Sequence, residues 1–352
     1  MNGGQELISP SSIRLDASTV CQLRCPCCPT ARGEIRAGLG SGFLTLQHFR
    51  QIVDGSGVQH VELASWGEAF LNPHLVGILE HADRKNIRLT IDGGANLNHV
   101  PADLADAIVR YRLYRLTCAI DGTTQETYAK YRRRGILQRV LENIDRINEA
   151  KSKRHSRFPI LRWQFVIFGH NEHEIPAAKA MASTLGMEIS FKLNWAEKYS
   201  PIRDPDFVRQ HTGLAAVTRS EHRQISGERY RQKLCCAQLW NMPAINWDGR
   251  VLGCSVNRWG DFGVVEQSLA DAVNSEKIAY ARQMLVGKAA ARPDIPCTVC
   301  HNYREMDRAQ NWLTSAEIEG FKELPVHDLS FARPERSRGL EPQSPGRGCR
   351  RT

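Results

Sequence analysis

The chain has 352 residues, with 47 Lys and Arg against 38 Asp and Glu, a net charge of +9, and 41% apolar residues. At about 100–200 residues per domain, this length predicts one large globular domain or two of ordinary size. No apolar run approaches the roughly 18–20 residues that span a bilayer, and the N-terminus lacks a signal-peptide pattern, so we expect a cytoplasmic protein without membrane contact. In that reducing compartment, the 11 cysteines are expected to be metal ligands or catalytic groups and not a disulfide framework.

Short β-rich segments alternate with helical patterns through the first half of the chain. Helix starts are marked by Thr45 as an N-cap and by Pro73 and Pro101. Six βα units in succession indicate a parallel sheet with right-handed crossovers. We therefore predict an α/β fold, a partial (β/α)6 TIM-like barrel. Its predicted strands are residues 13–18, 60–65, 88–92, 113–120, 160–168 and 188–193.

The pattern changes after this barrel. A charged segment without β character follows, and then Asp248-Gly249 lies between two apolar runs, which favours a hairpin over residues 244–252. A helix is expected from about residue 269 to 285. The predicted units are a barrel (1–199), a helical linker (200–234), a small domain with a β-hairpin and a helix (235–312), an extension (313–332) and a basic tail (333–352).

Basic residues are concentrated in the predicted tail, residues 333–352, which contains six Arg and two Glu among Pro, Gly and Ser. Such a segment cannot bury enough apolar area to fold, so we expect it to be disordered. The remainder carries a net charge of about +5. Shorter basic runs at 110–115 and 132–134 are interpreted as solvated faces or small anion sites, and no nucleic-acid partner is expected.

Polar residues follow the ends of several predicted strands. Cys21 comes after the first, Gly67 and Glu68 after the second, Asp92 after the third and Asp121 after the fourth. The carboxyl ends of parallel strands meet at one edge or face of a sheet, where α/β proteins place their active sites. These residues are therefore expected to converge on one site.

The loop after the first strand contains Cys21, Cys25 and Cys28 in the spacing CxxxCxxC. Three thiolates on one short loop can hold a cubane iron–sulfur cluster and leave one iron open to another ligand. A structural zinc site is the alternative, although zinc prefers four closed ligands and the remaining nearby thiol is Cys27.

This pattern resembles the radical S-adenosylmethionine (SAM) enzymes, whose signature is CxxxCxxC. Gly67-Glu68 is similar to the end of their GGE motif, which binds the SAM amino group, although Trp66 replaces the first glycine. The segment from Ala119 to Tyr128 resembles the one that precedes an arginine contacting the SAM carboxylate, so the resemblance implies that role for Arg132 or Arg133. Many members have serine where this chain has Ala119. Cys27 is expected to pack beside the adenine without binding iron.

The remaining grouped cysteines resemble the C-terminal SPASM/Twitch extension of the same enzymes, which holds auxiliary clusters. The spacing is Cys236-x12-Gly249-x4-Cys254, followed by Cys297-x2-Cys300. No further cysteine follows except Cys349 in the tail, so one auxiliary cluster is implied. Four thiolates in two pairs also suit a zinc ribbon. Spacing does not separate Cys235 from Cys236, and we prefer Cys236 as the ligand.

By resemblance, the protein binds two [4Fe–4S] clusters and SAM, cleaves SAM reductively to a 5′-deoxyadenosyl radical, and receives electrons from a flavodoxin- or ferredoxin-type donor. A closed auxiliary cluster implies that the substrate radical is oxidised, as in the Twitch-type dehydrogenases that oxidise an alcohol of an aminocyclitol. The expected substrate is a carbohydrate-like or aminocyclitol small molecule. The alternative is a maturase that cross-links or epimerises a ribosomal peptide.

Further candidates lie on the predicted strands. Lys192 is a candidate base for a substrate hydroxyl if burial lowers its pKa, and Cys118 is a candidate hydrogen-atom donor for epimerisation. Asp92 and Gln164 are expected among the cofactor-binding residues. An exposed lysine and a buried apolar cysteine remain the alternative interpretations of the first two residues.

Overall fold

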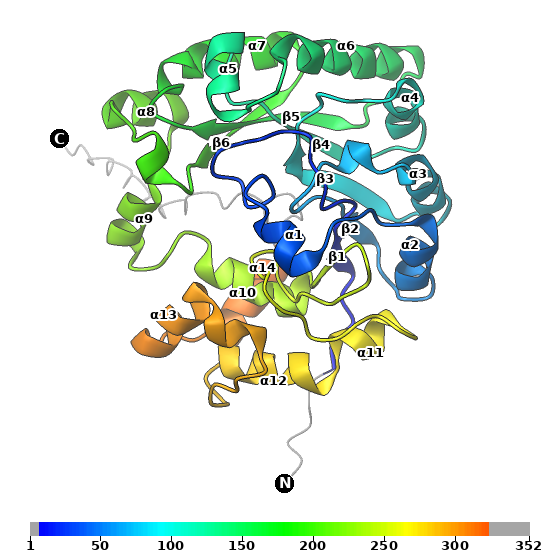
Figure 1. Cartoon of the computed structure of the whole chain (residues 1–352), viewed down its shortest axis with the longest axis vertical. Helices are drawn as coiled ribbons and strands as arrows, with labels where there is room; N and C mark the ends of the chain where they lie inside the picture. The colour runs from blue at the N-terminus through cyan, green and yellow to red at the C-terminus, as the bar shows by residue number, and fades with distance from the viewer. Residues whose placement is uncertain (1–6, 324–352) are drawn as a thin grey trace, which may run out of the picture.

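The computed structural model describes residues 7–323, and its centre is a parallel sheet of seven strands (Figure 1). The strands lie in the order β6-β5-β4-β3-β2-β1-β7 and every neighbouring pair is parallel. Strands β1 to β6 lie side by side in chain order, and β7 is added beside β1. Strands β6 and β7 are therefore the two edges of the sheet and do not pair with each other, so the barrel is open. The strands are β1 (Ser12–Leu15), β2 (His60–Glu62), β3 (Arg88–Ala95), β4 (Arg115–Ala119), β5 (Ile160–Ile167), β6 (Glu188–Leu193) and β7 (Ala244–Ile245).

Helices return the chain from each strand to the next and cover the outer face of the curved sheet (Figure 1). Thr45 caps α2 by accepting a hydrogen bond from the His48 amide at 3.1 Å, as the sequence predicts. Along α6, Val140, Ile144 and Ile147 form a fully buried stripe at helical spacing. The helices are α1 (Glu34–Leu39), α2 (Leu46–Val53), α3 (Leu75–Arg84), α4 (Ala102–Arg110), α5 (Gln125–Tyr131), α6 (Leu137–Lys153) and α7 (Ile175–Thr184). The predicted α/β partial barrel is confirmed.

The predicted hairpin at 244–252 is present, because the Asn246 amide donates to the Arg250 carbonyl at 2.8 Å and the Leu252 amide donates to the Ala244 carbonyl at 2.7 Å. Residues Ala244–Ile245 form β7, which extends the barrel sheet by pairing in parallel with Arg14 and Leu15 of β1. The antiparallel part is reduced to isolated bridges, Ile245 with Val251 and Arg250 with Val264. The first arm therefore pairs along both edges, with β1 on one side and with residues 250–253 on the other.

The predicted helix at 269–285 is divided into α11 (Leu269–Val273) and α12 (Glu276–Leu285). Asn274 lies at the break, and its side-chain amide bonds both backbone groups of Ile8, at 2.9 and 2.8 Å. Ser275 is extended at the start of α12. A contact with the N-terminal segment, distant in sequence, therefore occupies the break.

The predicted linker is helical and is divided into several short helices. It contains α8 (Pro205–Thr212), α9 (Arg219–Ser226) and the start of α10 (Gln232–Asn241), and Figure 1 shows α9 between the barrel and the C-terminal helices. Helix α14 (Ser315–Glu323) packs on α10, where Lys233 Nζ lies 2.8 Å from Glu317 Oε1. The remaining C-terminal helix is α13 (His301–Ala309). The predicted tail, 333–352, lies outside the described residues.

Candidate active site

A cavity of about 1220 Å³ opens at the carboxyl ends of the strands. The loop after β1, the turn after β2, strands β3 to β6 and the segment around α9 all contribute to its wall. Residues from the C-terminal domain complete the wall. The lining residues discussed below are Cys21, Cys25, Cys28, Gly67, Glu68, Gly94, Asn96, Ala119, Arg132, Gln164, Lys192, Trp195, Lys198, Arg219, Arg223, Arg229, Arg231, Cys235, Arg258 and Cys300.

The structure brings Cys21, Cys25 and Cys28 together on the loop between β1 and α1, where all three line the cavity. The loop turns tightly, because the Cys28 amide donates to the Cys25 carbonyl at 3.1 Å. Burial raises the pKa of Cys21 to about 12, and the Glu68 carboxylate adds to the shift. Cys27 lies on the same loop but outside the cavity lining, and its carbonyl accepts from Trp195 Nε1 at 3.3 Å.

Gly67 and Glu68 form the turn after β2. A Cβ at Gly67 would lie 2.2 Å from the Ser18 carbonyl oxygen, so a larger residue would displace the loop that leads to Cys21. Glu68 is 2% exposed, and its carboxylate accepts from the amides of Asn96 (2.6 Å) and Phe70 (3.2 Å). Burial raises the pKa of Glu68 to about 7. A buried carboxylate is thus fixed at the cavity wall.

Of the two arginine candidates, Arg132 faces the cavity. Its Nε lies 2.6 Å from Oδ2 of Asp121, which is fully buried and also accepts from the Val166 amide at 2.8 Å. The charge of Arg132 opposes the effect of burial, which raises the pKa of Cys25. Arg133 is exposed and does not line the cavity.

The structure places Asp92 away from the cavity, because β3 continues to Ala95 and does not end at residue 92 as expected. The Asp92 carboxylate instead lies in the sheet interior, 3.3 Å from Arg115 Nη1 and 3.0 Å from Thr117 Oγ1. The cavity residue at this strand end is Asn96, which sequence reasoning missed. Its Nδ2 lies 3.7 Å from Cys21 Sγ.

Cys118 is also placed away from the cavity. Side chains alternate along β4, so that Ala119 lines the cavity while Cys118 is fully buried in the main hydrophobic core. Burial raises the pKa of the Cys118 thiol. The alternative interpretation of this residue, a buried apolar cysteine, describes its surroundings.

Lys192 and Gln164 meet in the cavity wall, where Lys192 Nζ donates to Gln164 Oε1 at 3.2 Å. Gln164 is 3% exposed. Burial lowers the pKa of Lys192 to about 7, and the charges of Arg231 and Arg219 add to the shift. Near neutral pH, Lys192 therefore has a substantial neutral fraction that can accept a proton.

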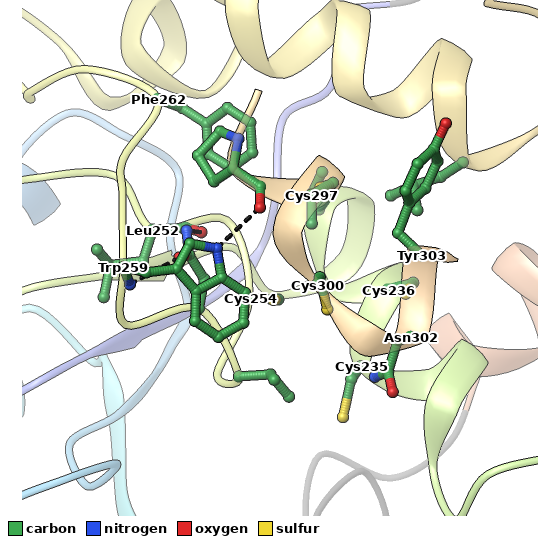
Figure 2. A pocket seen from close by; sticks show the side chains of 15 residues that line it. Cys235, Cys236, Leu252, Cys254, Trp259, Phe262, Cys297, Cys300, Asn302 and Tyr303 are labelled. Atoms are coloured by element: carbon green, nitrogen blue, oxygen red, sulfur yellow. Dashed lines mark hydrogen bonds between the residues drawn. The ribbon is translucent and has the colours of Figure 1, made fainter. Parts of the chain in front are cut away.

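A second, smaller pocket collects five cysteines from three separate segments (Figure 2). Burial raises the pKa of Cys254 to about 12, and it also raises those of Cys236 and Cys297. Apolar side chains including Leu239, Leu252 and Phe262 close the pocket. The five cysteines are Cys235 and Cys236 on α10, Cys254 after the bridged segment, Cys297 in the short 3-10 helix Pro296–Val299, and Cys300 directly before α13.

The two cysteine sites border one cavity. Cys235 and Cys300 line the small pocket and also the large cavity with Cys21, Cys25 and Cys28, and their sulfurs point the same way in Figure 2. The ten described cysteines are free thiols. Within residues 7–323, no group of three or more His, Cys, Asp or Glu side chains converges as a site for a single metal ion.

Comparison with known families identifies both halves of this arrangement. The radical SAM superfamily matches residues 16–180, and an iron–sulfur cluster-binding domain, SPASM, matches residues 235–302. The chain thus contains a radical SAM domain and a C-terminal SPASM domain. It therefore uses SAM, a SAM-binding [4Fe–4S] cluster and an auxiliary [4Fe–4S] cluster, as the sequence predicts. The free thiols grouped in two sites provide suitable donors for such clusters.

Individual relatives are distant. A GTP 3′,8-cyclase from Ectopseudomonas mendocina (strain ymp) is 25% identical over 187 residues, which are 51% of this chain and 52% of the relative. The match thus spans about half the length of that protein. Streptococcus suis SuiB bound to S-adenosylmethionine is 13% identical with a TM-score of 0.58, covering 85% of this chain and 73% of SuiB. The histidine-tagged protein anSMEcpe with bound AdoMet is 13% identical with a TM-score of 0.51, covering 86% of this chain and 97% of anSMEcpe.

These structural matches establish a shared fold and leave the substrate open. In the described part of this radical SAM protein, no helix is both long and apolar enough to cross a bilayer.

Proposed function

We propose that Cys21, Cys25 and Cys28 hold the SAM-binding cluster. The support is their position on one tight loop facing the large cavity, next to the buried Glu68 and to Arg132. In the same proposal, Gly67 and Glu68 receive the amino group of SAM and Arg132 its carboxylate. Glu68 supplies carboxylate acceptors and Arg132 the positive charge, and hydrogen bonds already fix both side chains.

The auxiliary cluster is assigned to Cys236, Cys254, Cys297 and Cys300. The four thiols share one pocket with apolar walls. Cys236, Cys254 and the Cys297–Cys300 pair come from three different segments of the chain. Cys235 occupies the border with the large cavity and remains outside this ligand set.

We propose that the protein oxidises an alcohol carbon of a small polar molecule. The observation that supports this reaction is the single cavity bordered by both cysteine sites. When bound, the cofactors supply a radical that takes one hydrogen atom from the carbon and an acceptor for one electron. The hydroxyl proton must leave as well, so that a secondary alcohol becomes a ketone with the loss of one hydrogen atom, one proton and one electron.

Lys192 is positioned to accept the proton. It lines the cavity, its Nζ is held by Gln164, and its pKa of about 7 leaves a neutral amine available near neutral pH. Lys192 therefore acts as the base at the substrate hydroxyl in this proposal, and Gln164 orients it.

The cavity volume supports a small substrate. Ligand pockets typically enclose about 300–1,000 Å³, and this one, at about 1220 Å³, has to hold SAM as well. A flavodoxin- or ferredoxin-type protein is the proposed electron donor. A peptide substrate is the outcome that would replace this proposal.

The test is anaerobic reconstitution with iron and sulfide, followed by iron analysis and a SAM-cleavage assay under reduction. Wild type is expected to bind about eight irons and to release 5′-deoxyadenosine, whereas the Cys21/Cys25/Cys28→Ala variant keeps about four and releases none. Cys27→Ala is the matched control for iron content, because Cys27 shares the loop but does not line the cavity. Full iron content in the triple variant would overturn the ligand assignment.

The substrate class is then tested by incubating the active enzyme with polyols and with short peptides. Formation of a ketone and one 5′-deoxyadenosine per turnover supports the oxidation. Turnover of peptides alone would replace it with peptide modification.

A further inference from the structure

The cavity wall formed by the predicted linker is strongly cationic. Arg219 and Arg223 on α9, and Arg229 and Arg231 on the turn that leads to α10, all line the cavity. Lys192 lies close enough to Arg231 and Arg219 for both charges to lower its pKa. An anionic ligand would be attracted to this wall.

Most cavity arginines already have carboxylate partners. Arg223 forms an ion pair with Glu305, and Arg229 lies 3.5 Å from the same carboxylate. Arg258 pairs with Glu34 at 3.0 Å. These side chains are held by the protein and have less charge to offer to a ligand.

Arg219 differs from Arg223, Arg229 and Arg258. Within residues 7–323 no carboxylate lies within ion-pair distance of its guanidinium, which instead packs over the Tyr230 ring at 5.0 Å. Its Nε is buried, and no described residue accepts a hydrogen bond from it. The neighbouring Glu197 carboxylate is engaged with the Ser220 amide (2.8 Å) and hydroxyl (2.6 Å).

Partial burial of a guanidinium is unfavourable unless an anion or a hydrogen-bond acceptor compensates for the lost hydration. The Nε itself is closed to a ligand, but the two Nη atoms are not among the buried atoms and no described residue bonds them, so an oxyanion in the cavity can reach them. The planar fork of arginine also matches the two oxygens of a phosphate or carboxylate.

We propose that Arg219, with Arg231 beside it, binds an anionic group of the substrate, so that the substrate is an acidic small molecule carrying a phosphate or a carboxylate. This inference rests on the proposed function, because it takes the large cavity as the substrate site. The anion would be held close to Lys192, which places the oxidised carbon near the base.

The test measures anion binding by the reconstituted holoenzyme with saturating SAM and no reductant, so that SAM occupies its own site. Equilibrium dialysis uses radiolabelled inorganic phosphate in one arm and radiolabelled succinate in the other. Saturable binding of either probe is expected, and the tighter arm identifies the oxyanion. Arg219→Gln should weaken it at least about tenfold, the effect of losing roughly 1.4 kcal/mol of charge-assisted hydrogen bonding.

Arg223→Gln is the matched control, because Arg223 lies one turn further along the same helix but is paired with Glu305. It should change the dissociation constant by less than about twofold, as expected of an exposed ion pair. If Arg219→Gln loses iron on purification, Arg219→Lys serves instead and should weaken binding less than Gln while retaining iron.

Equal binding by the Arg219 and Arg223 variants would overturn the proposal, as would the absence of saturable binding by both probes to wild type. Dialysis does not depend on SAM cleavage. A wild-type enzyme that binds phosphate but releases no 5′-deoxyadenosine under reduction would instead count against the proposed function alone.

Discussion

The two cysteine sites differ in how they are built and in what surrounds them. Cys21, Cys25 and Cys28 come from one short loop and face a cavity of about 1220 Å³. The auxiliary cysteines come from three segments between residues 235 and 300, and apolar side chains such as Leu239 and Phe262 enclose them. The first site leaves room for another molecule beside the thiols, whereas the second, called the closed site below, is smaller and lined mainly by apolar side chains.

Under the proposed function, this difference corresponds to two chemical tasks. An open cluster site admits a cofactor that reacts, so its polar surroundings, Glu68 and Arg132, are fixed by hydrogen bonds before the cofactor arrives. A closed site can exchange electrons, and burial among apolar groups tunes its potential. Cys235 and Cys300 lie at the shared border of the two sites.

The strongest test of this comparison removes one ligand from each site. Cys28→Ala should reduce 5′-deoxyadenosine formation below about one hundredth of wild type, because even residues around metal ligands contribute roughly 10–100-fold. Cys254→Ala should retain SAM cleavage and lose substrate oxidation. Chromatography of 5′-deoxyadenosine and product distinguishes the two, and loss of SAM cleavage in both would show that the sites do not act separately.

The next prediction tests which of the adjacent residues Cys235 and Cys236 on α10 binds the auxiliary cluster. Cys236→Ala should lose about four irons per chain, because the proposal makes it a ligand, whereas Cys235→Ala should retain them. Iron and sulfide analysis after reconstitution measures the difference. The reverse result would make Cys235 the ligand in place of Cys236.

Local patterns in the sequence predicted the barrel and the N-terminal loop well. Hydrophobic periodicity gives α6 and the strands, and three cysteines within eight residues are close whatever the fold. The ends of the strands were harder to predict. The prediction ended β3 three residues too early and so placed Asp92 at the cavity, whereas the structure places it in the sheet interior. Successive side chains of a strand point to opposite faces of the sheet, so only one of Cys118 and Ala119 can face the cavity. The sequence does not show which face of β4 that is.

Tertiary contacts explain what the sequence could not show. The pairing of β7 with β1 and the break at Asn274 depend on partners more than 200 residues away. The arginines of the predicted linker were an unrecognised signal, because nothing local indicates that α9 lines the cavity or that Arg219, unlike Arg223, has no ion pair within residues 7–323.

Lys192 provides a smaller, pH-dependent test of the open site. Its pKa is lowered to about 7, so the neutral base is lost as the pH falls below 7, and kcat/KM for oxidation should rise through that pH and level off above it. Lys192→Met should reduce oxidation by about 100–10,000-fold and remove this pH dependence. Rates measured from about pH 5.5 to 9 test both points.

Lys198→Met is the control for that profile, since Lys198 also lines the cavity but is exposed. Its profile should keep the wild-type midpoint. An unchanged midpoint in Lys192→Met would assign the titration to another group. Bound substrate anion would relieve part of the repulsion from Arg219 and Arg231, so the value near 7 applies to kcat/KM, which reports the free enzyme.

The smallest expected effect concerns Cys118, which lies on the opposite face of β4 from the cavity. Cys118→Ala should leave SAM cleavage and product formation within about twofold of wild type, because the thiol is fully buried in the core and lines neither of the two cavities described above. Removing one buried heavy atom should lower stability by about 0.5–1.5 kcal/mol, a shift of a few degrees in the thermal inactivation of the holoenzyme. If the variant retained its thermal stability but lost product, the thiol would be a hydrogen-atom donor, and the reaction would be redox-neutral instead of an oxidation through the closed site.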